Sequence, residues 1–285
     1  GIAAIDIIAQ EAMEKFGKNR VQYKNFKWRF YSTENFDIYF YDDGHLMAKE
    51  VATYLEEEFD KITDLIGYPP YAKTKIFLYN SIKDLQESNV GIDDNRFDIG
   101  GETKFVKPYV EVANPGTSQE LKEELILKVS QFLVNEMLFG GSIKDMFQST
   151  YLLNLPSWFV LGISEYIAKG WNDEMDDYVR ELMVNFNPKK LARYNQQNSK
   201  IIGQSIWNYI AERYGRSNIS NILNYTRIIR NEEKSIAATL GVSFSTLLLE
   251  WEAYYSGLND QLLTSYIRPE EMSVLAKNKG KYDLH

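Results

Sequence analysis

The hydrophobic periodicity of this 285-residue sequence changes at Asn114-Pro115-Gly116, and this change constrains the fold more than any other feature. Before the break, stretches with strand-like alternation are mixed with helical stretches, whereas after it almost every apolar stretch has helical spacing. The break is followed by Thr117-Ser118-Gln119-Glu120, a capping box that predicts a helix running to Leu138. The sequence therefore predicts an α+β fold, with a mixed part first and a helical part second.

Strand-like and helical patterns alternate in the first part. Phe36, Ile38 and Phe40 alternate with more polar residues, as a half-buried strand requires. A long helix is predicted at 48–66, because apolar residues recur there at helical spacing and Gly67 follows as a stop signal. The other elements predicted in this part are a strand-like region at 28–41, strands at 75–79 and 105–113, and helices at 2–16 and 81–87.

The second part is predicted to consist of helices, without an internal repeat or a low-complexity linker. Beyond the helix that ends at Leu138, the predicted helices lie at 146–154, 157–169, 174–184, 205–214, 219–229, 235–240 and 243–255.

Composition limits the class of protein and its partners. The hydrophobic content of 44% and the charged content of 25% are typical of a folded protein. The formal net charge of -8 argues against nucleic acid or an anionic membrane surface as the main partner, since both need a cationic surface. Without cysteine, neither a disulfide nor a thiolate metal site can form. No apolar run approaches the roughly 18 residues that a transmembrane helix needs, so no transmembrane segment is expected.

A motif in the second part resembles a signature of the gluzincin metallopeptidases. Residues 155–166 read LPSWFVLGISEY, similar to the family signature LPxWxxEGxAEY, in which the glutamate before the glycine is the third zinc ligand. Leu161 stands at that position. Farther along, the stretches 202–215 and 240–251 resemble the helical lobe of peptidase-MA-like domains. The resemblance implies a thermolysin-like (gluzincin) architecture of two lobes, in which a mixed sheet with helices precedes a mostly helical lobe.

The same resemblance implies that the helix ending at Leu138 is the former zinc-binding helix. Its end, Asn135-Glu136-Met137-Leu138, is similar to the tail of family helices that carry the motif HExxH. Counting back from this tail places the HExxH window on residues 127–131. The vestigial zinc-site positions implied by the resemblance are Leu127, Lys128, Gln131 and Leu161.

These four residues cannot bind zinc in the manner of the family. A gluzincin holds zinc with two histidines one helical turn apart and a carboxylate farther along the chain, and it uses a glutamate as general base. Leucine has no lone pair, the amide oxygen of glutamine is a poor zinc ligand, and lysine replaces the base with a cation. The whole sequence contains only His45 and His285, so no HxxxH spacing exists in it. We therefore expect a pseudopeptidase with no catalytic residue, metal or cofactor.

The sequence leaves two interpretations open for three of these positions and for Glu165. Leu127 and Leu161 are either core leucines or residues that line a vestigial cleft. Lys128 is either a solvated helix residue or a cation at the former metal position. Glu165 is either a structural or exposed carboxylate or part of a binding surface. The candidate cleft comprises Trp158, Glu165 and Tyr166.

Other catalytic chemistry has little support in the sequence. A serine hydrolase is not indicated, because neither a G-x-S-x-G nor an S-x-x-K motif occurs. The acids Asp173, Glu174, Asp176 and Asp177 could bind calcium, but they begin a predicted helix, where acids interact favourably with the helix dipole.

The enzymatic alternative is a carboxylate-based glycosidase, which needs two carboxylates about 5 to 10 Å apart among aromatic side chains. Glu165 is its only support.

A narrower resemblance concerns the biological setting. The stretches 20–23, 36–41 and 135–141 are similar to the N-terminal domain of bacterial TolB-like proteins, in which this domain precedes a β-propeller. The resemblance implies a protein-binding, peptide-binding or scaffolding module of a bacterial envelope protein, in the periplasm or at the outer membrane, with a propeller downstream. The chain starts at Gly1 rather than at a methionine, which indicates processing or trimming, so a signal peptide or a lipid anchor could have been removed beforehand. The organisation expected is an extension at 1–19, an α+β lobe at 20–138, a helical lobe at 139–268 and a tail at 269–285.

Overall fold

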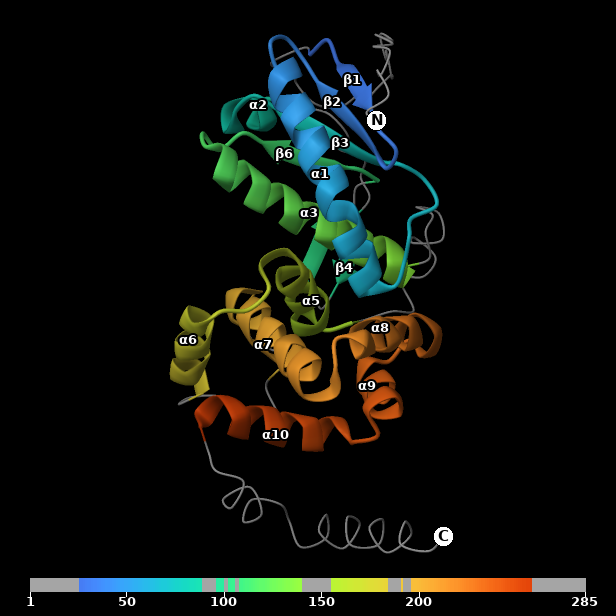
Figure 1. Cartoon of the computed structure of the whole chain (residues 1–285), viewed down its shortest axis with the longest axis vertical. Coiled ribbons are helices and arrows are strands. Elements are labelled where there is room, and N and C mark those ends of the chain that lie inside the picture. Colours follow the sequence, from blue (N-terminus) through green and yellow to red (C-terminus); the bar gives the residue numbers. More distant parts are fainter. Residues whose placement is uncertain are drawn as a thin grey trace, which may run out of the picture.

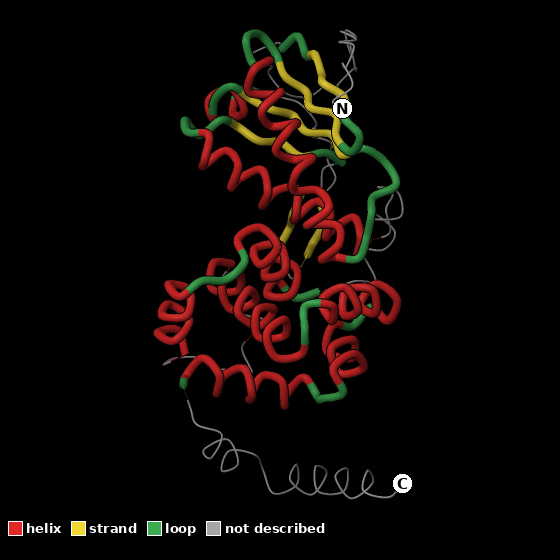
Figure 2. The backbone as a smooth tube through the Cα atoms, in the orientation of Figure 1, coloured by secondary structure: helices red, strands yellow, loops and turns green. Residues whose placement is uncertain are grey.

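The computed structural model has an α+β fold. A mixed sheet and two long helices lie at one end, and a group of mostly shorter helices lies at the other end (Figure 1, Figure 2). The structure describes residues 26–88, 96–99, 102–105, 108–139, 155–183, 191 and 196–257. The extension at 1–19, the tail at 269–285 and the predicted helices at 2–16 and 146–154 lie outside these residues.

The sheet has four strands in the order β1-β2-β3-β6. The first pair is antiparallel, and the pairs β2–β3 and β3–β6 are parallel. Parallel neighbours need a crossover connection, which α1 supplies between β2 and β3. The strands of this sheet are β1 (Arg29–Ser32), β2 (Phe36–Phe40), β3 (Thr74–Tyr79) and β6 (Val110–Ala113). A separate antiparallel pair is formed by β4 (Arg96–Ile99) and β5 (Glu102–Phe105).

One face of the sheet packs against α1 (His45–Ile66) and α3 (Ser118–Phe139), as Figure 1 shows. Phe36, Ile38 and Phe40 alternate toward this face and are buried, which confirms the predicted alternation. Their burial beneath α1 removes apolar surface from water, which is the main favourable contribution to folding here. The short helix α2 (Ile82–Gln86) follows β3.

The opposite face of the sheet is aromatic. Tyr41, Phe77 and Tyr79 are buried there beneath Phe26 and Trp28, which precede β1. The ring centroid of Trp28 lies 5.2 Å from that of Phe77 and 5.3 Å from that of Tyr79, in edge-to-face contacts. The sheet therefore has apolar residues on both faces, and the aromatic contacts add to the stability of the second one.

The remaining helices pack around a core of large side chains. Trp207, Trp251 and Tyr255 are almost fully buried at its centre. In the described part of the chain, no helix is long and apolar enough to cross a membrane. The helices are α5 (Ser157–Lys169), α6 (Asp173–Met183), α7 (Gln196–Tyr214), α8 (Ser217–Ile229), α9 (Glu232–Leu240) and α10 (Phe244–Ser256).

The sheet end and the helical end share one hydrophobic core. A single cluster of buried residues runs from Ile38 in the sheet, through Leu133 in α3 and Ile163 in α5, to Trp251 in α10. α3 belongs to both ends, because it contacts α1 and β6 on one side and α5 on the other. The boundary expected at residue 138 therefore falls at the end of a helix that joins the two parts.

Two predicted strand regions are each divided in the structure. The region at 28–41 is a hairpin, because the backbone turns at Thr33, whose N–H donates to the carbonyl of Phe36 over 2.8 Å. The stretch at 105–113 contains the end of β5 and all of β6 rather than one strand. The N-cap contact of the predicted capping box is present: the N–H of Glu120 donates to Oγ1 of Thr117 over 3.3 Å, and that hydroxyl donates to Glu120 Oε2 over 2.8 Å.

Candidate functional site

Lys128 links α3 to the end strand of the sheet. Its Nζ donates to the backbone carbonyl of Glu111 in β6 over 2.8 Å. The same ammonium lies 2.8 Å from Oε1 of Glu124, one turn earlier on α3. Lys128 is thus neither simply solvated nor part of a set of metal ligands, since its charge is held between a carboxylate and a backbone carbonyl.

The carbonyl bound by Lys128 faces away from the sheet. The N–H of Asn114 donates to the carbonyl of Tyr79 in β3, so the backbone groups of Asn114 are directed at β3. Successive residues of a strand alternate in direction, which turns the backbone groups of Glu111 and Ala113 outward. β6 is the last strand of the four-stranded sheet in the described part of the chain. Lys128 therefore binds the outer edge of the sheet.

The other vestigial positions are half-buried. Leu127 and Gln131 lie one turn apart on α3, and Leu161 lies on α5. Leu127 and Leu161 are partly buried and are not among the fully buried residues of the core. Within the described residues, no group of three or more His, Cys, Asp or Glu side chains could hold a metal ion.

Glu165 is a buried carboxylate with two cationic partners. Its side chain is 4% exposed, and its two oxygens lie 2.7 Å from Nζ of Lys169 and 3.4 Å from Nζ of Lys200. Lys169 is one turn farther along α5, and Lys200 comes from α7. Glu165 thus joins two helices, which is a structural role and gives no support to an acid–base role on a sugar.

Trp158 and Tyr166 are interior residues as well. Trp158 is 2% exposed, and its ring stacks on that of Phe244 with 5.4 Å between centroids. Tyr166 is 7% exposed, and burial raises the pKa of its hydroxyl. The three residues expected to mark a cleft therefore pack inside the protein, and in this structure they do not line an open surface.

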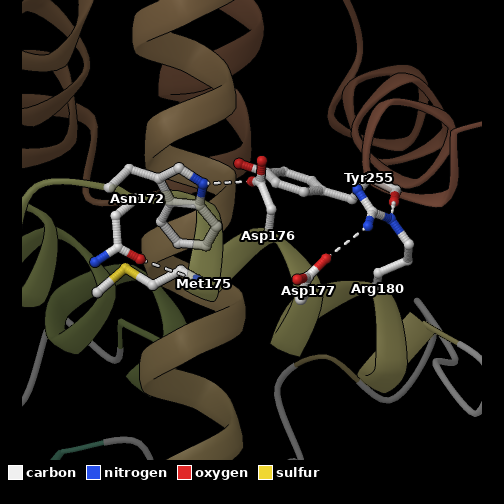
Figure 3. A network of polar contacts seen from close by, with 7 residues as sticks. Asn172, Met175, Asp176, Asp177, Arg180 and Tyr255 are labelled. Carbon is white, nitrogen blue, oxygen red and sulfur yellow. Dashed lines mark hydrogen bonds and ion pairs between the residues drawn. The ribbon is translucent and has the colours of Figure 1, made fainter.

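The acids at the start of α6 also have structural partners (Figure 3). Asp176 accepts a hydrogen bond of 2.6 Å from Nε1 of Trp171. Asp177 pairs with Nη1 of Arg180 over 2.8 Å, and Nε of Arg180 donates to the backbone carbonyl of Tyr255 over 3.4 Å. These contacts hold α6 against the end of α10, and they agree with the helix-start interpretation of the acidic cluster rather than with calcium binding.

An open groove of about 480 Å³ lies between α1 and the start of α3. Glu50 receives a hydrogen bond of 2.5 Å from Oγ of Ser118 and lies 3.4 Å from Nζ of Lys122, and both contacts lower its pKa. Lys122 in turn lies 5.3 Å from the ring centroid of Tyr54. Because these opposite charges are paired with each other, this groove offers no strong charge selection for a ligand. It is lined by Leu46, Lys49, Glu50, Thr53, Tyr54, Glu57 and Lys122.

Sequence reasoning missed a second unusual carboxyl group on α3. Glu136 is half-buried, its Oε2 has no hydrogen-bond partner among the described residues, and burial raises its pKa to about 6. The charge of Glu136 contributes to raising the pKa of Tyr68 to about 12, after the larger effect of burial, and the hydroxyl of Tyr68 also has no described partner. One signal was available: Glu136 lies two helical turns after the buried Val129, so it falls on the apolar face of α3.

Neither a scan against protein-family models nor a search of the curated proteins finds a match for this chain.

Proposed function

We propose that this chain is a catalytically inactive, peptidase-like module that binds an extended polypeptide along the outer edge of β6. The observation that carries the proposal is the arrangement of β6 beside α3, where the outward carbonyl of Glu111 faces the helix that carries Leu127, Lys128 and Gln131. An end strand with outward backbone groups can accept a further strand through main-chain hydrogen bonds.

The absence of peptidase activity follows from the donor set. Leu127 and Leu161 provide no lone pair, and Gln131 provides only an amide, so these positions lack the nitrogen and carboxylate ligands that zinc requires. Lys128 cannot serve as a general base for water, because its ammonium is bound to Glu124 and Glu111. A module with this set of side chains would bind a polypeptide without hydrolysing it.

The thermolysin-like two-lobe architecture is part of the same proposal. It is supported by the motif at 155–166 and by the order of a mixed sheet followed by helices. The bacterial envelope setting, the periplasmic or outer-membrane location and the downstream propeller stay predictions that depend on the resemblance to TolB-like proteins.

The proposal is tested by removing one outward N–H from β6. In Glu111→Pro the proline lacks an N–H that points away from β3, so the β3–β6 hydrogen bonds are retained. Glu111→Ala is the matched control, because it loses the same side chain and keeps the N–H. Binding of fluorescently labelled casein, used as an unfolded polypeptide probe, is measured by anisotropy for both variants.

We expect Glu111→Ala to bind the probe and Glu111→Pro to bind about tenfold more weakly, because one main-chain hydrogen bond is lost and the proline ring hinders close approach of the added strand. Circular dichroism verifies that both variants are folded. The proposal would be overturned if the two folded variants bound casein equally well. It would also be overturned if neither the wild-type chain nor Glu111→Ala bound casein.

A further inference from the structure

We propose that the hydroxyl of Tyr68 and the carboxylate of Glu136 form a binding site for a primary ammonium group, where α1, α3 and α8 meet. The hydroxyl oxygen of Tyr68 and Oε2 of Glu136 are both buried, and neither has a hydrogen-bond partner among the described residues. The inference goes beyond the proposed function, because it does not involve the edge of β6.

The meeting point of the three helices brings Tyr68 and Glu136 close together. α1 ends at Gly67, and a Cβ added there would lie 2.7 Å from Cβ of Ser220, so α8 packs directly against this end of α1. Glu136 lies in the last turn of α3, and α3 contacts both α1 and α8 (Figure 1). After the larger effect of burial, the charge of Glu136 raises the pKa of Tyr68, which requires the two groups to be neighbours.

The two oxygens need a partner that the described side chains do not provide. Tyr68 is 6% exposed, so its hydroxyl has no compensating contact with bulk water. A buried polar group without a hydrogen bond costs free energy, and a buried carboxylate costs more. The two groups do not bond to each other, so a ligand that binds both must lie between them. Oε1 of Glu136 is not among the buried oxygens without a partner, and its side chain is only half-buried, so the carboxylate can be reached from solvent.

The chemistry of the two oxygens favours a cationic hydrogen-bond donor. A carboxylate only accepts hydrogen bonds, and a phenol oxygen can accept one as well. A primary ammonium group has three N–H donors, so it can bind both oxygens and offset the negative charge. Hard metal ions require about six oxygen ligands, whereas this pair of side chains offers far fewer. In agreement, no metal-binding group of His, Cys, Asp or Glu is found in the described part of the chain.

The neighbouring charges leave the site accessible to a cation. Tyr71 and Arg227 are the other groups whose charges act on the pKa of Tyr68, and the effect of Arg227 is the smallest. The pKa of Glu136 is raised by burial alone, so no cationic side chain acts on this carboxylate. An ammonium group bound there would therefore meet little repulsion and would supply the positive charge that the carboxylate lacks.

The experiment measures thermal unfolding at pH 7 in methylammonium chloride and in tetramethylammonium chloride. The two salts have the same ionic strength at equal concentration, but only methylammonium can donate hydrogen bonds. For a dissociation constant of about 10 mM and about 50 mM salt, we expect the midpoint of unfolding to be about 2 °C higher in methylammonium.

Three variants assign the effect to the site. Glu136→Gln removes the charge and Tyr68→Phe removes the hydroxyl, and both keep the shape of the side chain, so each should abolish the difference between the two salts. Tyr71→Phe is the matched control, because it removes the hydroxyl of an exposed tyrosine whose ring centroid lies 6.2 Å from that of Tyr68. It should retain the difference. Comparing two salts within each variant cancels the change in stability that the substitution itself causes.

Equal midpoints of the wild-type chain in the two salts would disprove the site. So would a full difference in Glu136→Gln or in Tyr68→Phe, because the ammonium group would then bind elsewhere. Repeating the measurement with Nα-acetyllysine amide distinguishes two sources of the same group. A comparable rise would identify a site for a lysine side chain, and a rise with methylammonium alone would identify a site for a small free amine.

Discussion

Gly162 of α5 and Gly203 of α7 bring the backbones of these two helices into direct contact. A Cβ added to Gly203 would lie 1.9 Å from the carbonyl oxygen of Trp158, and one added to Gly162 would lie 2.4 Å from the carbonyl carbon of Gly203. Both distances are far below any real carbon contact, and the neighbouring atoms belong to backbone that cannot rotate away. The glycine of the motif at 155–166 therefore has a packing role, which does not depend on metal binding.

Gly203→Ala is expected to destabilise the protein by about 3 kcal/mol, because the two helices must separate or bend, and this cost exceeds the gain in helix propensity of about 1 kcal/mol. The free energy of unfolding is measured by denaturant titration. Gly241→Ala is the matched control: its Cβ would meet nothing within 4 Å, so only its positive φ of 73° is strained, at a cost of about 1 kcal/mol. Equal losses for the two variants would refute the close crossing.

Removing the lysines around Glu165 is expected to cost more than removing the carboxylate. In Lys169→Met/Lys200→Met the carboxylate stays buried without its cations, at a cost of about 3 kcal/mol. In Glu165→Gln the two lysines are 46% and 35% exposed and turn to water, so the loss is about 1 kcal/mol or less. Thermal and denaturant unfolding of both variants measure the difference, and a larger loss for Glu165→Gln would contradict the burial of this ion pair.

Stability is expected to depend on pH through Glu136. Burial raises its folded-state pKa from 4.5 to about 6, so between these values the folded chain holds a proton that the unfolded chain releases. The contribution of Glu136 to the free energy of unfolding therefore decreases as pH rises through this window, and this contribution does not change further above it. For a half-buried group we expect a loss of about 1 kcal/mol between pH 4.5 and pH 7.

Glu136→Gln should remove this part of the pH dependence, and denaturant unfolding at the two pH values measures it. Glu181→Gln, on the exposed side of α6, controls for the loss of one negative charge. The expectation fails if Glu136→Gln and the wild-type chain lose the same stability over this pH range.

Elements with strong local signals could be predicted from the sequence. The helix predicted at 157–169 has the same bounds in the structure, because Pro156 precedes it and Gly170 ends it. The helix after the Pro115-Gly116 break begins within one residue of its prediction, because the Thr117 hydroxyl accepts a hydrogen bond from the N–H of Glu120 at the helix start. These signals lie within a few residues of each boundary, so they do not depend on tertiary contacts.

Features that need partners far along the chain could not be predicted. α7 begins at Gln196 rather than at 205, and Gln204, the last residue before the predicted start, is bound by a residue outside its helix. Nε2 of Gln204 donates to the carbonyl of Gly170 over 2.8 Å, and Nε1 of Trp251 donates to Oγ of Ser205 over 3.0 Å. The ion pair of Glu165 could not be predicted for the same reason, because its partner Lys200 of α7 lies 35 residues later in the sequence. The edge contact of Lys128 likewise requires β6 and α3 to pack.

The metal content of the chain tests the central claim, a peptidase-like module without zinc chemistry. The purified protein is equilibrated with zinc, dialysed, and analysed by mass spectrometry for metal bound per chain. Since Leu127, Gln131 and Leu161 offer no histidine or carboxylate ligand, we predict well below one zinc per chain. One tightly bound zinc per chain, lost when Gln131 is changed to Ala, would contradict the account.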